Sequence, residues 1–389
     1  MSKELTTSVY LDHAASTPAR PEVVAEMLPW LTDHPGNPSG GHAAARAARR
    51  AIDDARDYVA TLVGCEPGEV VFTSGGTEAD NLAVDGVVRA TSGLPVCSAA
   101  EHPAVLAPVN DAGGIVIPTN VGGCIDLEAL AVVLDSVDDV CIVSTMAVNN
   151  ETGVVTDLEA VADVIAQYAP QALLHSDAVQ AAAWMDLPKS AHRAELVSVT
   201  GHKFGGPKGA GALIVRAGVS LDPVIRGGGQ ERERRSGTQN VPAIVGLGEA
   251  ARLVVLEREA MIQRVGALRD RLEEGLLAKI VGVNRTIPNG FARTPGVSHV
   301  CFEGIESEEL LFLLEREGIA ASSASSCASG AQEPSHVLAA MGIDRVTASG
   351  SLRLSLGHAS SDTDVDHALV AIPPAVEHLR DHARSVQSQ

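Results

Sequence analysis

Lysine is scarce in this sequence: the 389 residues include five, at positions 3, 189, 203, 208 and 279. A reaction that needs an amine nucleophile therefore has few candidates. The chain also lacks an apolar run approaching the roughly 20 residues that span a bilayer. Its first residues lack the basic stretch and apolar core of a signal peptide. We therefore expect no membrane association and no secretion.

The six cysteines are scattered, and no two of them form a Cys-x-x-Cys pair. This spacing disfavours a zinc knuckle and a disulfide framework, so we expect no metal site and a reducing compartment, the cytoplasm. Positive charge is scarce as well, because 29 basic against 49 acidic residues leave a formal charge of -20. A nucleic-acid binder needs a basic surface to neutralise phosphates, so we expect no nucleic-acid partner.

Short runs rich in valine and isoleucine alternate with helical patterns through the first two-thirds of the chain. The strand candidates are residues 69–74, 95–99, 140–148, 172–177, 195–200 and 211–216. Such alternation predicts a mainly parallel sheet covered by helices, and near-continuous apolar strands suit burial on both faces. A helix over residues 40–63, rich in alanine and arginine, should end at Gly64.

The rest of the chain predicts a second, smaller α+β unit. A long helix covers about residues 242–279 and carries Arg269 and Glu273 as a surface pair four residues apart. After it come strand patterns over 297–302, 319–323 and 351–356 and helical patterns over 306–317 and near His336. Between the two units, residues 217–241 combine glycines with a charged run, which is typical of a solvated loop.

Polar residues gather where strands are predicted to end. The segment SGGTEAD (74–80) lies between a strand and a helix, so its backbone N–H groups suit a bound phosphate. A tight turn without a ligand is the alternative. Asp177 ends the strand over 172–177, and Gln180 follows three residues later. Both would lie at the same sheet edge as the turn, although a carboxylate there also suits a helix N-cap.

Lys203 is the leading candidate for an amine nucleophile. It follows the strand over 195–200, among glycines and beside His202, whereas Lys208 follows Pro207 in a descending turn. The other three lysines lie in a terminus, a loop and a surface helix. A lysine that forms a Schiff base needs a desolvated or cationic site, because an ordinary amine is protonated at neutral pH. Together, a phosphate turn, a strand-end aspartate and such a lysine supply what pyridoxal phosphate requires.

Ten segments, in order along the chain, resemble the cysteine desulfurases, a group of class V aminotransferases among the fold-type I pyridoxal phosphate enzymes. They are LDHAAST (11–17), GNPSG (36–40), FTSGGTEADN (72–81), EHPAV (101–105), VNNETG (148–153), HSDAVQ (175–180), TGHKFGGPKGAGAL (200–213), GGGQERERRSGTQN (227–240), SSASSCASG (322–330) and SLRLSLG (351–357). The lysine motif and phosphate turn are shared with wider relatives. The cysteine loop combined with RSGT is more discriminating.

The resemblance implies the α/β fold of type I pyridoxal phosphate-dependent transferases: three layers, with a mainly parallel central sheet and a smaller α+β domain. It implies a large cofactor-binding domain over residues 16–255. The small domain, residues 1–15 and 256–389, would carry the catalytic cysteine loop. A homodimer is also implied, since the GNPS and RSGT segments match parts that lie at the subunit boundary of the family.

The resemblance further implies roles for residues around the cofactor. Lys203 matches the lysine that forms the Schiff base, and Asp177 matches the partner of the pyridine nitrogen. His102 matches the histidine that lies on the face of the cofactor and shuttles protons, and Gln180 the donor to its phenolic oxygen. The residues that match phosphate contacts are Gly76, Thr77, Thr200 and His202, together with Thr238, which reaches the phosphate of the neighbouring subunit.

Three further residues match the substrate side of the family site. Asn150, beside the cofactor, and Arg353 match the groups that receive the substrate carboxylate, for which the planar fork of an arginine is well suited. Cys327 matches the nucleophile. A lone thiol is more often a buried spectator, but the small residues around Cys327 favour an accessible one. Because an ordinary thiol is only a few per cent thiolate at pH 7, its activation would need nearby positive charge or proton transfer.

The implied reaction converts L-cysteine to L-alanine and leaves the sulfur as a persulfide on Cys327. The sulfur would pass to an acceptor protein, such as an iron–sulfur cluster scaffold or a tRNA thiolation protein. The alternatives are a selenocysteine lyase or another class V aminotransferase, and a sulfur-relay protein on a dead enzyme fold, which the set of Lys203, Asp177 and Arg353 disfavours. Ala324 and Ser326 depart from many relatives, and the C-terminal end lacks the longer scaffold-binding tail of some.

Overall fold

The computed structural model describes residues 9–323 and 335–387. Its main feature is a seven-stranded sheet with the strand order β2-β8-β7-β6-β5-β3-β4. The strands are β2 (Val70–Thr73), β3 (Leu94–Ser98), β4 (Ile115–Ile117), β5 (Val140–Ser144), β6 (Leu173–Asp177), β7 (Leu196–Thr200) and β8 (Gly211–Val215). β8 runs antiparallel to β2 and β7, and the other neighbours are parallel. The mainly parallel sheet is therefore confirmed.

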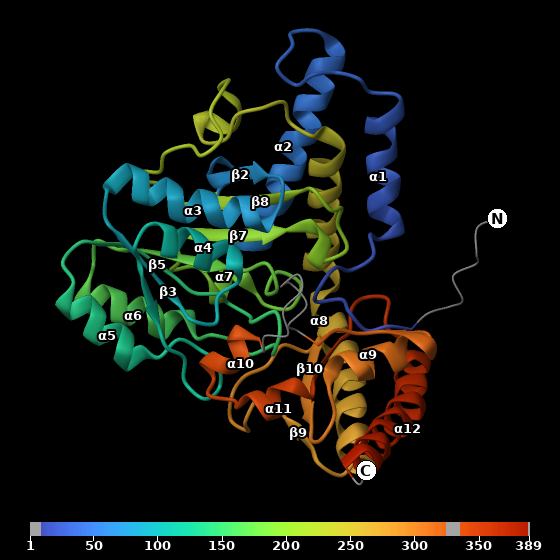
Figure 1. Cartoon of the computed structure of the whole chain (residues 1–389). Coiled ribbons are helices and arrows are strands. Elements are labelled where there is room, and N and C mark those ends of the chain that lie inside the picture. The colour runs from blue at the N-terminus through green and yellow to red at the C-terminus, as the bar shows by residue number, and fades with distance from the viewer. Residues whose placement is uncertain (1–8, 324–334, 388–389) are drawn as a thin grey trace.

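Helices cover both faces of this sheet, which makes three layers. α3 (Gly76–Thr91) and α4 (Pro103–Asp111) lie on one face, in front of the sheet in Figure 1. On the opposite face lie α2 (Ala43–Val63), α5 (Leu127–Ser136), α6 (Leu158–Tyr168) and α8 (Val241–Lys279). Alternate strand residues serve the two layers, since Val70 and Phe72 pack with the α2–α8 side while Val71 packs with α3. The three-layer α/β fold is thus confirmed.

The C-terminal part is built on a smaller antiparallel sheet of order β12-β10-β9. Its strands are β9 (Val283–Arg285), β10 (Val297–Phe302) and β12 (Ser351–Ser355), and its helices are α9 (Ser307–Arg316), α10 (His336–Ala340), α11 (Arg345–Ser349) and α12 (Asp362–Gln387). α8 extends from the large sheet into this part (Figure 1). β1 (Val9–Tyr10) pairs in parallel with β11 (Ile319–Ala320), so the N-terminal segment joins the C-terminal part.

Several element boundaries differ from the sequence-based expectation. α2 ends as predicted at Gly64, whose φ of 74° is the left-handed conformation that glycine tolerates. β5 ends at Ser144 instead of residue 148, because residues 145–148 bend across the end of β6: the Thr145 and Ala147 amides donate to the carbonyls of His175 and Asp177. The sequence analysis also missed α1 (Pro21–Thr32), α5 and α6.

The predicted surface pair of Arg269 and Glu273 is wrong. Both residues are buried, and Glu273 is only 1% exposed. Its carboxylate binds Arg285 at 2.6 Å and Arg293 at 2.8 Å, two partners that follow the helix in the sequence. Glu273 therefore joins α8 to β9 and its neighbouring segment instead of stabilising the helix locally.

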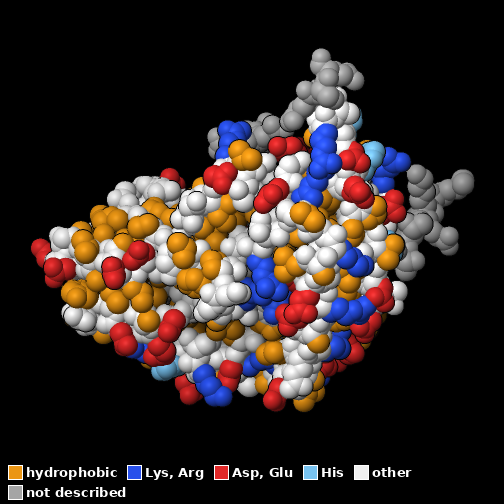
Figure 2. Space-filling model, turned by 90° about the horizontal axis from the view of Figure 1, so that it is seen from below, with side chains coloured by type: hydrophobic (Ala, Val, Ile, Leu, Met, Phe, Trp, Pro, Cys, Tyr) orange, Lys and Arg blue, Asp and Glu red, His pale blue; other side chains and the backbone are white. Residues whose placement is uncertain are grey.

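The surface seen from below carries interspersed acidic and basic side chains (Figure 2). On that face the basic groups form no continuous area. Within residues 9–323 and 335–387, no helix combines the length and apolar character that crossing a bilayer requires.

Candidate active site

The carboxyl ends of β6 and β7 bring the predicted site residues together. Asp177 is the last residue of β6, is buried, and accepts a hydrogen bond from the Val179 amide at 2.9 Å. Turns, not a helix, follow it, so the alternative of a helix N-cap is wrong. Burial raises the pKa of Asp177, and the Val179 amide and the electrostatic interactions with His102 and Lys203 oppose this shift. Asp177, His102 and Lys203 therefore share one electrostatic environment.

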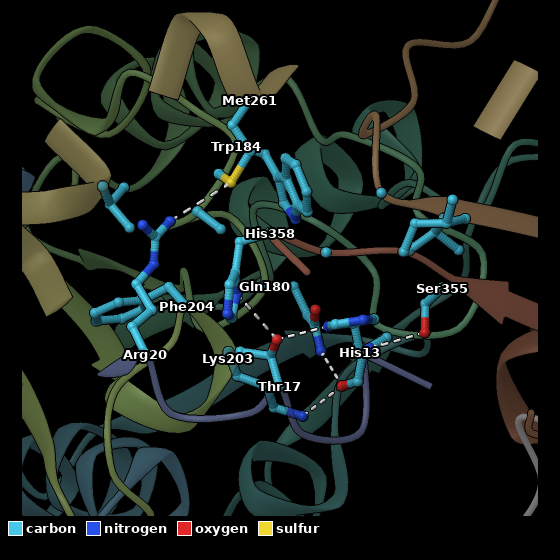
Figure 3. Close-up of a pocket in the computed structure, with 17 residues that line it drawn as sticks. His13, Thr17, Arg20, Gln180, Trp184, Lys203, Phe204, Met261, Ser355 and His358 are labelled. Atoms are coloured by element: carbon cyan, nitrogen blue, oxygen red, sulfur yellow. Dashed lines mark hydrogen bonds between the residues drawn. The ribbon is translucent and has the colours of Figure 1, made fainter. Parts of the chain in front are cut away.

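Lys203 lies on a single 3-10 turn, Gly201–Lys203, directly after β7. Its Nζ donates to the Ala14 carbonyl at 2.6 Å and to the Ala15 carbonyl at 3.0 Å. Gln180 Nε2 donates to the same Ala14 carbonyl at 2.7 Å, so both side chains converge on one oxygen (Figure 3). The lysine is thus held by the backbone of the N-terminal segment instead of extending into solvent.

His102 is the N-cap residue of α4, and its Nδ1 accepts the Ala104 amide at 3.1 Å. Burial, followed by the charges of Lys203 and His336, lowers its pKa, while Asp177 opposes the shift. The ring is therefore neutral at pH 7 and carries its hydrogen on Nε2. A neutral ring fixed in this way can lie against a flat ligand and exchange a proton through Nε2.

The turn at residues 74–76 shapes the candidate phosphate site. Gly76 is the first residue of α3, where backbone N–H groups lack helical partners. A Cβ at Gly76 would lie 2.8 Å from Val179 Cγ2, so this close approach to the turn after Asp177 requires glycine. Thr200 packs beside Gly76 and donates its hydroxyl to the Ala210 carbonyl at 3.0 Å. Thr77 is exposed.

His202 and Thr238 complete the predicted phosphate set. His202 is half-buried, and its Nδ1 lies 3.4 Å from Ser16 Oγ. Thr238 is exposed and makes no hydrogen bond to the other predicted site residues within the described ranges. Because its predicted role concerns a neighbouring subunit, a single chain does not test it.

The loop over residues 227–240 is anchored by a buried ion pair that the sequence analysis missed. Glu231 is 5% exposed and binds both terminal nitrogens of Arg56, at 2.9 and 3.0 Å. It also accepts the Phe72 amide at 3.0 Å. The interpretation of this stretch as a merely solvated loop is therefore wrong at its centre. Charged residues among glycines gave the only available signal.

The same loop also reaches the phosphate turn. Arg235 Nε lies 2.7 Å from Glu78 Oε1, and Glu78 Oε2 accepts the Ser74 amide at 2.8 Å. Burial opposes ionisation of Glu78, but these partners hold its pKa below the usual value. Glu78 and Arg235 thus join the turn at residues 74–76 to the loop over residues 227–240.

The predicted substrate arginine lies where the two parts of the chain meet. Arg353 is 5% exposed on β12, and its Nη2 lies 2.7 Å from Asp12 Oδ1. Its Nη1 donates to the backbone carbonyl of Asn150 at 2.9 Å, and its buried Nε has no partner among the described residues. The structure therefore brings Arg353 and Asn150 together and adds Asp12, a residue that the sequence analysis did not select.

Cys327 lies outside the described residues, but both ends of its segment are placed. Ser322 and Arg353 exchange backbone hydrogen bonds, and Ser335 donates to Glu151, the neighbour of Asn150. The cysteine segment therefore starts and ends beside the predicted substrate residues. Burial raises the pKa of the five other thiols, Cys65, Cys97, Cys124, Cys141 and Cys301, which makes each a poor nucleophile.

A pocket lies between Lys203 and the N-terminal segment, and both contribute to its lining (Figure 3). Lys203 and Gln180 line it together with His13, Arg20 and His358. The other predicted cofactor residues do not line this pocket. It therefore borders the site that the strand ends form without coinciding with it.

These residues fit pyridoxal phosphate. The buried carboxylate of Asp177 suits a cationic ring nitrogen, the neutral His102 suits a flat ring, and the N-terminus of α3 suits a phosphate. Lys203 follows β7 on a glycine-rich turn. Among the described residues, no group of three or more histidine, cysteine or acidic side chains could hold a metal ion.

Known proteins of one family are similar to this chain over nearly its whole length. The family model for class-V aminotransferases matches residues 9–368. The chain is 43% identical to an IscS-like cysteine desulfurase of Mycobacterium tuberculosis, covering 95% of this chain and 97% of the relative. It is 41% identical to the cysteine desulfurase IscS of Methanosarcina thermophila, covering 96% and 93%.

Solved structures agree with these matches. A NifS-like protein superimposes with a TM-score of 0.89 at 32% identity, covering 96% of this chain and 100% of the other. A structure of SspA in complex with cysteine superimposes with a TM-score of 0.77 at 31% identity, covering 90% and 99%. The chain therefore belongs to the class-V aminotransferase family and, within it, to the pyridoxal phosphate-dependent cysteine desulfurases.

Proposed function

We propose that this cysteine desulfurase takes sulfur from L-cysteine, releases L-alanine and holds the sulfur as a persulfide on Cys327. The observation that carries the assignment of its site is that Asp177 at the end of β6, Lys203 after β7 and His102 at the start of α4 interact electrostatically. Arg353, the predicted group for the substrate carboxylate, lies where the cysteine segment begins.

The proposed cofactor contacts follow from this arrangement. Asp177 holds the ring nitrogen, Gln180 the phenolic oxygen, and His102 one face of the ring. The phosphate is held by Gly76, Thr77, Thr200 and His202, with Thr238 contributed to the neighbouring subunit. When bound, pyridoxal phosphate withdraws electrons from the substrate α-carbon through its protonated ring.

The protein residues orient the substrate and move its protons. Arg353 and Asn150 receive the carboxylate, so the α-carbon faces Lys203. Lys203 removes the α-proton as a general base and returns a proton as an acid, with His102 Nε2 as a second proton carrier. Burial keeps the His102 ring neutral, and with Nδ1 accepting the Ala104 amide its Nε2–H faces outward as the donor.

Cys327 performs the sulfur transfer. Its thiolate attacks the substrate sulfur, a sulfur–sulfur bond forms, and the bond between Cβ and sulfur breaks with its electron pair going to carbon. Proton uptake at Cβ then completes the methyl group of alanine. The persulfide remains on Cys327 until a sulfur-acceptor protein removes it.

Two substitutions test these assignments. Cys327→Ser should keep the yellow colour of the bound cofactor and abolish sulfide release from L-cysteine, whereas Lys203→Ala should lose the visible band and the activity together. Cys301→Ser is the matched control, since that thiol is buried. Desulfuration at the wild-type rate by Cys327→Ser would sink the persulfide role. Running L-selenocysteine in parallel separates the alternative of a selenocysteine lyase, which need not use Cys327.

The proposed function also includes a homodimer, a sulfur acceptor and two domains. A homodimer explains why Thr238 is exposed, because the phosphate contact of its own subunit does not use it; sedimentation of a monomer with full cofactor occupancy would contradict this. We propose an iron–sulfur scaffold or a tRNA thiolation protein as the sulfur acceptor, and a cytoplasmic location. We also propose the division into residues 16–255 and residues 1–15 with 256–389, which the pairing of β1 with β11 supports.

A further inference from the structure

Two adjacent residues contact the predicted substrate arginine and the end of the cysteine segment. The Asn150 carbonyl accepts a hydrogen bond from Arg353 Nη1 at 2.9 Å. The carboxylate of the next residue, Glu151, accepts a hydrogen bond from the hydroxyl of Ser335, with which the described chain resumes after the cysteine segment. Glu151 and Ser335 are 5% and 6% exposed, so solvent competes little for this bond. Asn150 and Glu151 therefore join the substrate side of the site to the end of the cysteine segment.

The position of these two residues is fixed by Asn149, which is 2% exposed. Its Oδ1 accepts the amides of Glu151 and Thr152 at 2.9 and 3.0 Å. Its Nδ2 donates to the Ala100 carbonyl at 3.1 Å, and Ala100 lies two residues before His102. The Glu151 carboxylate is therefore carried by a turn that is hydrogen-bonded to the cofactor side of the site.

The hydroxyl of Ser335 has one direction left for its hydrogen. Ser335 is the N-cap residue of α10, and its Oγ accepts the amides of Val337 and Leu338 at 3.1 and 3.3 Å. Because the oxygen has two lone pairs and both accept amides, the O–H group donates to Glu151. The same serine thus begins α10 and attaches it to the substrate side.

The next residue gives a second attachment. His336 Nε2 donates to the Glu101 carbonyl at 2.8 Å, and Glu101 is adjacent to His102 in the chain. The chain that follows the cysteine segment is therefore attached at two neighbouring positions. Of the two acceptors, Glu101 uses its backbone and Glu151 its side chain, so substitution of Glu151 can test the attachment.

We propose that Glu151 is a positioning residue for the sulfur-transfer step: by holding Ser335, it fixes the end of the cysteine segment beside the proposed substrate arginine. The role rests on the proposed function, because it takes Cys327 as the sulfur acceptor. Glu151 acts through Ser335 and takes no part in making or breaking bonds to sulfur.

Removal of the acceptor should slow sulfur transfer without weakening substrate binding. In Glu151→Ala, the rate at which Cys327 gains sulfur from L-cysteine in a single turnover, followed by the mass of the intact protein, should fall about tenfold to a hundredfold, since a small misplacement of a reacting group has an effect of this size. L-Alanine binding, followed by the visible band of the cofactor, should stay at the wild-type level because Arg353 and Asn150 are retained. Glu151→Gln keeps an acceptor oxygen and should behave like the wild type.

Substitutions at Ser335 test the same bond from its other side and do not require Glu151→Ala to fold. Ser335→Ala should slow transfer equally, whereas Ser335→Thr keeps the hydroxyl and should transfer at the wild-type rate. Glu151→Ala combined with Ser335→Ala should be no slower than either single variant. Asp344→Ala is the matched control, because Asp344 is exposed and caps α11, another helix of five residues, without being a partner of Glu151.

The outcomes separate this inference from the proposed function. If Cys327→Ser gains sulfur as the wild type does, the proposed function fails, whatever the Glu151 variants do. If the wild type forms the persulfide on Cys327 and Ser335→Ala or a folded Glu151→Ala retains the wild-type rate, the inference is overturned. It is also overturned if L-alanine binding weakens in step with transfer, which would indicate a role in substrate binding, or if Asp344→Ala slows transfer equally, which would indicate general destabilisation.

Discussion

The cofactor side of the active site and its substrate side handle charge in opposite ways. On the cofactor side, Asp177 is buried with one backbone hydrogen bond, and the neighbouring carboxyl oxygens of Asp80 and Glu101 include atoms without partners among the described residues. On the substrate side, the Arg353 guanidinium already has protein partners: it forms an ion pair with Asp12 and donates a hydrogen bond to the Asn150 carbonyl.

This difference matches the times for which the cofactor and the substrate remain bound. A cofactor that stays bound can supply, through its cationic ring, the positive partner of the Asp177 carboxylate. The protein therefore leaves the position of this partner to the cofactor. A substrate carboxylate must arrive and leave in every turnover, and in the proposed site the Asp12 carboxylate binds Arg353 in its place. We therefore expect the cofactor side to respond to substitution mainly through stability and cofactor binding, and the substrate side mainly through KM.

The largest effect should come from the ion pair that anchors the 227–240 loop on the cofactor side. Arg56→Met leaves Glu231 buried without its main partner and should lower the free energy of unfolding by about 3–5 kcal/mol in urea titrations. Arg50→Met, on an exposed position of the same helix, is the control. Adding Glu231→Gln to Arg56→Met should recover much of the loss; a loss below about 1 kcal/mol in the single variant would contradict a structural role for the pair.

The substrate side should respond in kinetics instead. Arg353→Lys removes the planar fork and should lower kcat/KM for L-cysteine about a hundredfold, or about 2.7 kcal/mol of transition-state stabilisation. Cofactor occupancy, followed by the visible band, should stay at the wild-type level. If the visible band is lost while KM is unchanged, Arg353 supports cofactor binding and not substrate binding, and the proposed difference between the two sides is wrong.

Buried neutral histidines predict a loss of stability in mild acid. Burial lowers the pKa of His299 to about 3, below the value near 6.5 of the unfolded chain. The unfolded state therefore binds more protons below pH 6.5, and the stability present above that pH is lost as the pH falls toward 3. Between pH 7 and 5.5 this ring should cost about 1 kcal/mol, and His299→Gln should reduce the pH dependence of urea unfolding by that amount. An unchanged dependence would show that His299 has the same pKa in the folded and unfolded protein.

The smallest effect is expected at Asp12, whose carboxylate binds Arg353 when substrate is absent. Asp12→Asn removes the charge that competes for Arg353 and should lower KM for L-cysteine about threefold, since a partly exposed ion pair contributes less than about 1 kcal/mol. Steady-state kinetics on matched preparations measure this. A rise in KM would mean that Asp12 orients the arginine instead of competing with substrate.

The sequence predicted the features that depend on local pattern. Apolar strands, the glycine stop at residue 64 and the polar residues at strand ends follow from the residues near each position. The missed helices α5 and α6 could also have been predicted from the sequence, because Asp126 and Asp157 are N-cap residues that each accept hydrogen bonds from two amides of the helix. The roles of Cys327 and Arg353 came from resemblance to a family and not from the pattern.

Features that depend on distant partners could not be predicted. Glu273 looked like part of a surface pair, but Arg285 and Arg293 approach it only after β9 and β10 have folded back on α8. Glu231 lies 175 residues from Arg56 in the sequence, and nothing near either residue indicates the pairing. The ion pair of Asp12 and Arg353 spans 341 residues.

The N-terminal segment gives the site a particular order of assembly. Residues 9–14 supply the strand that pairs with β11, the Asp12 carboxylate for Arg353, and the carbonyl that holds Lys203 and Gln180. Residues 9–14 are made long before β11 and can pair with it only once that strand has been synthesised. Contacts of such sequence separation form late in folding. A chain synthesised only as far as Lys203 therefore carries this lysine before β11 and Arg353 exist, so the site cannot be assembled during that stage of synthesis.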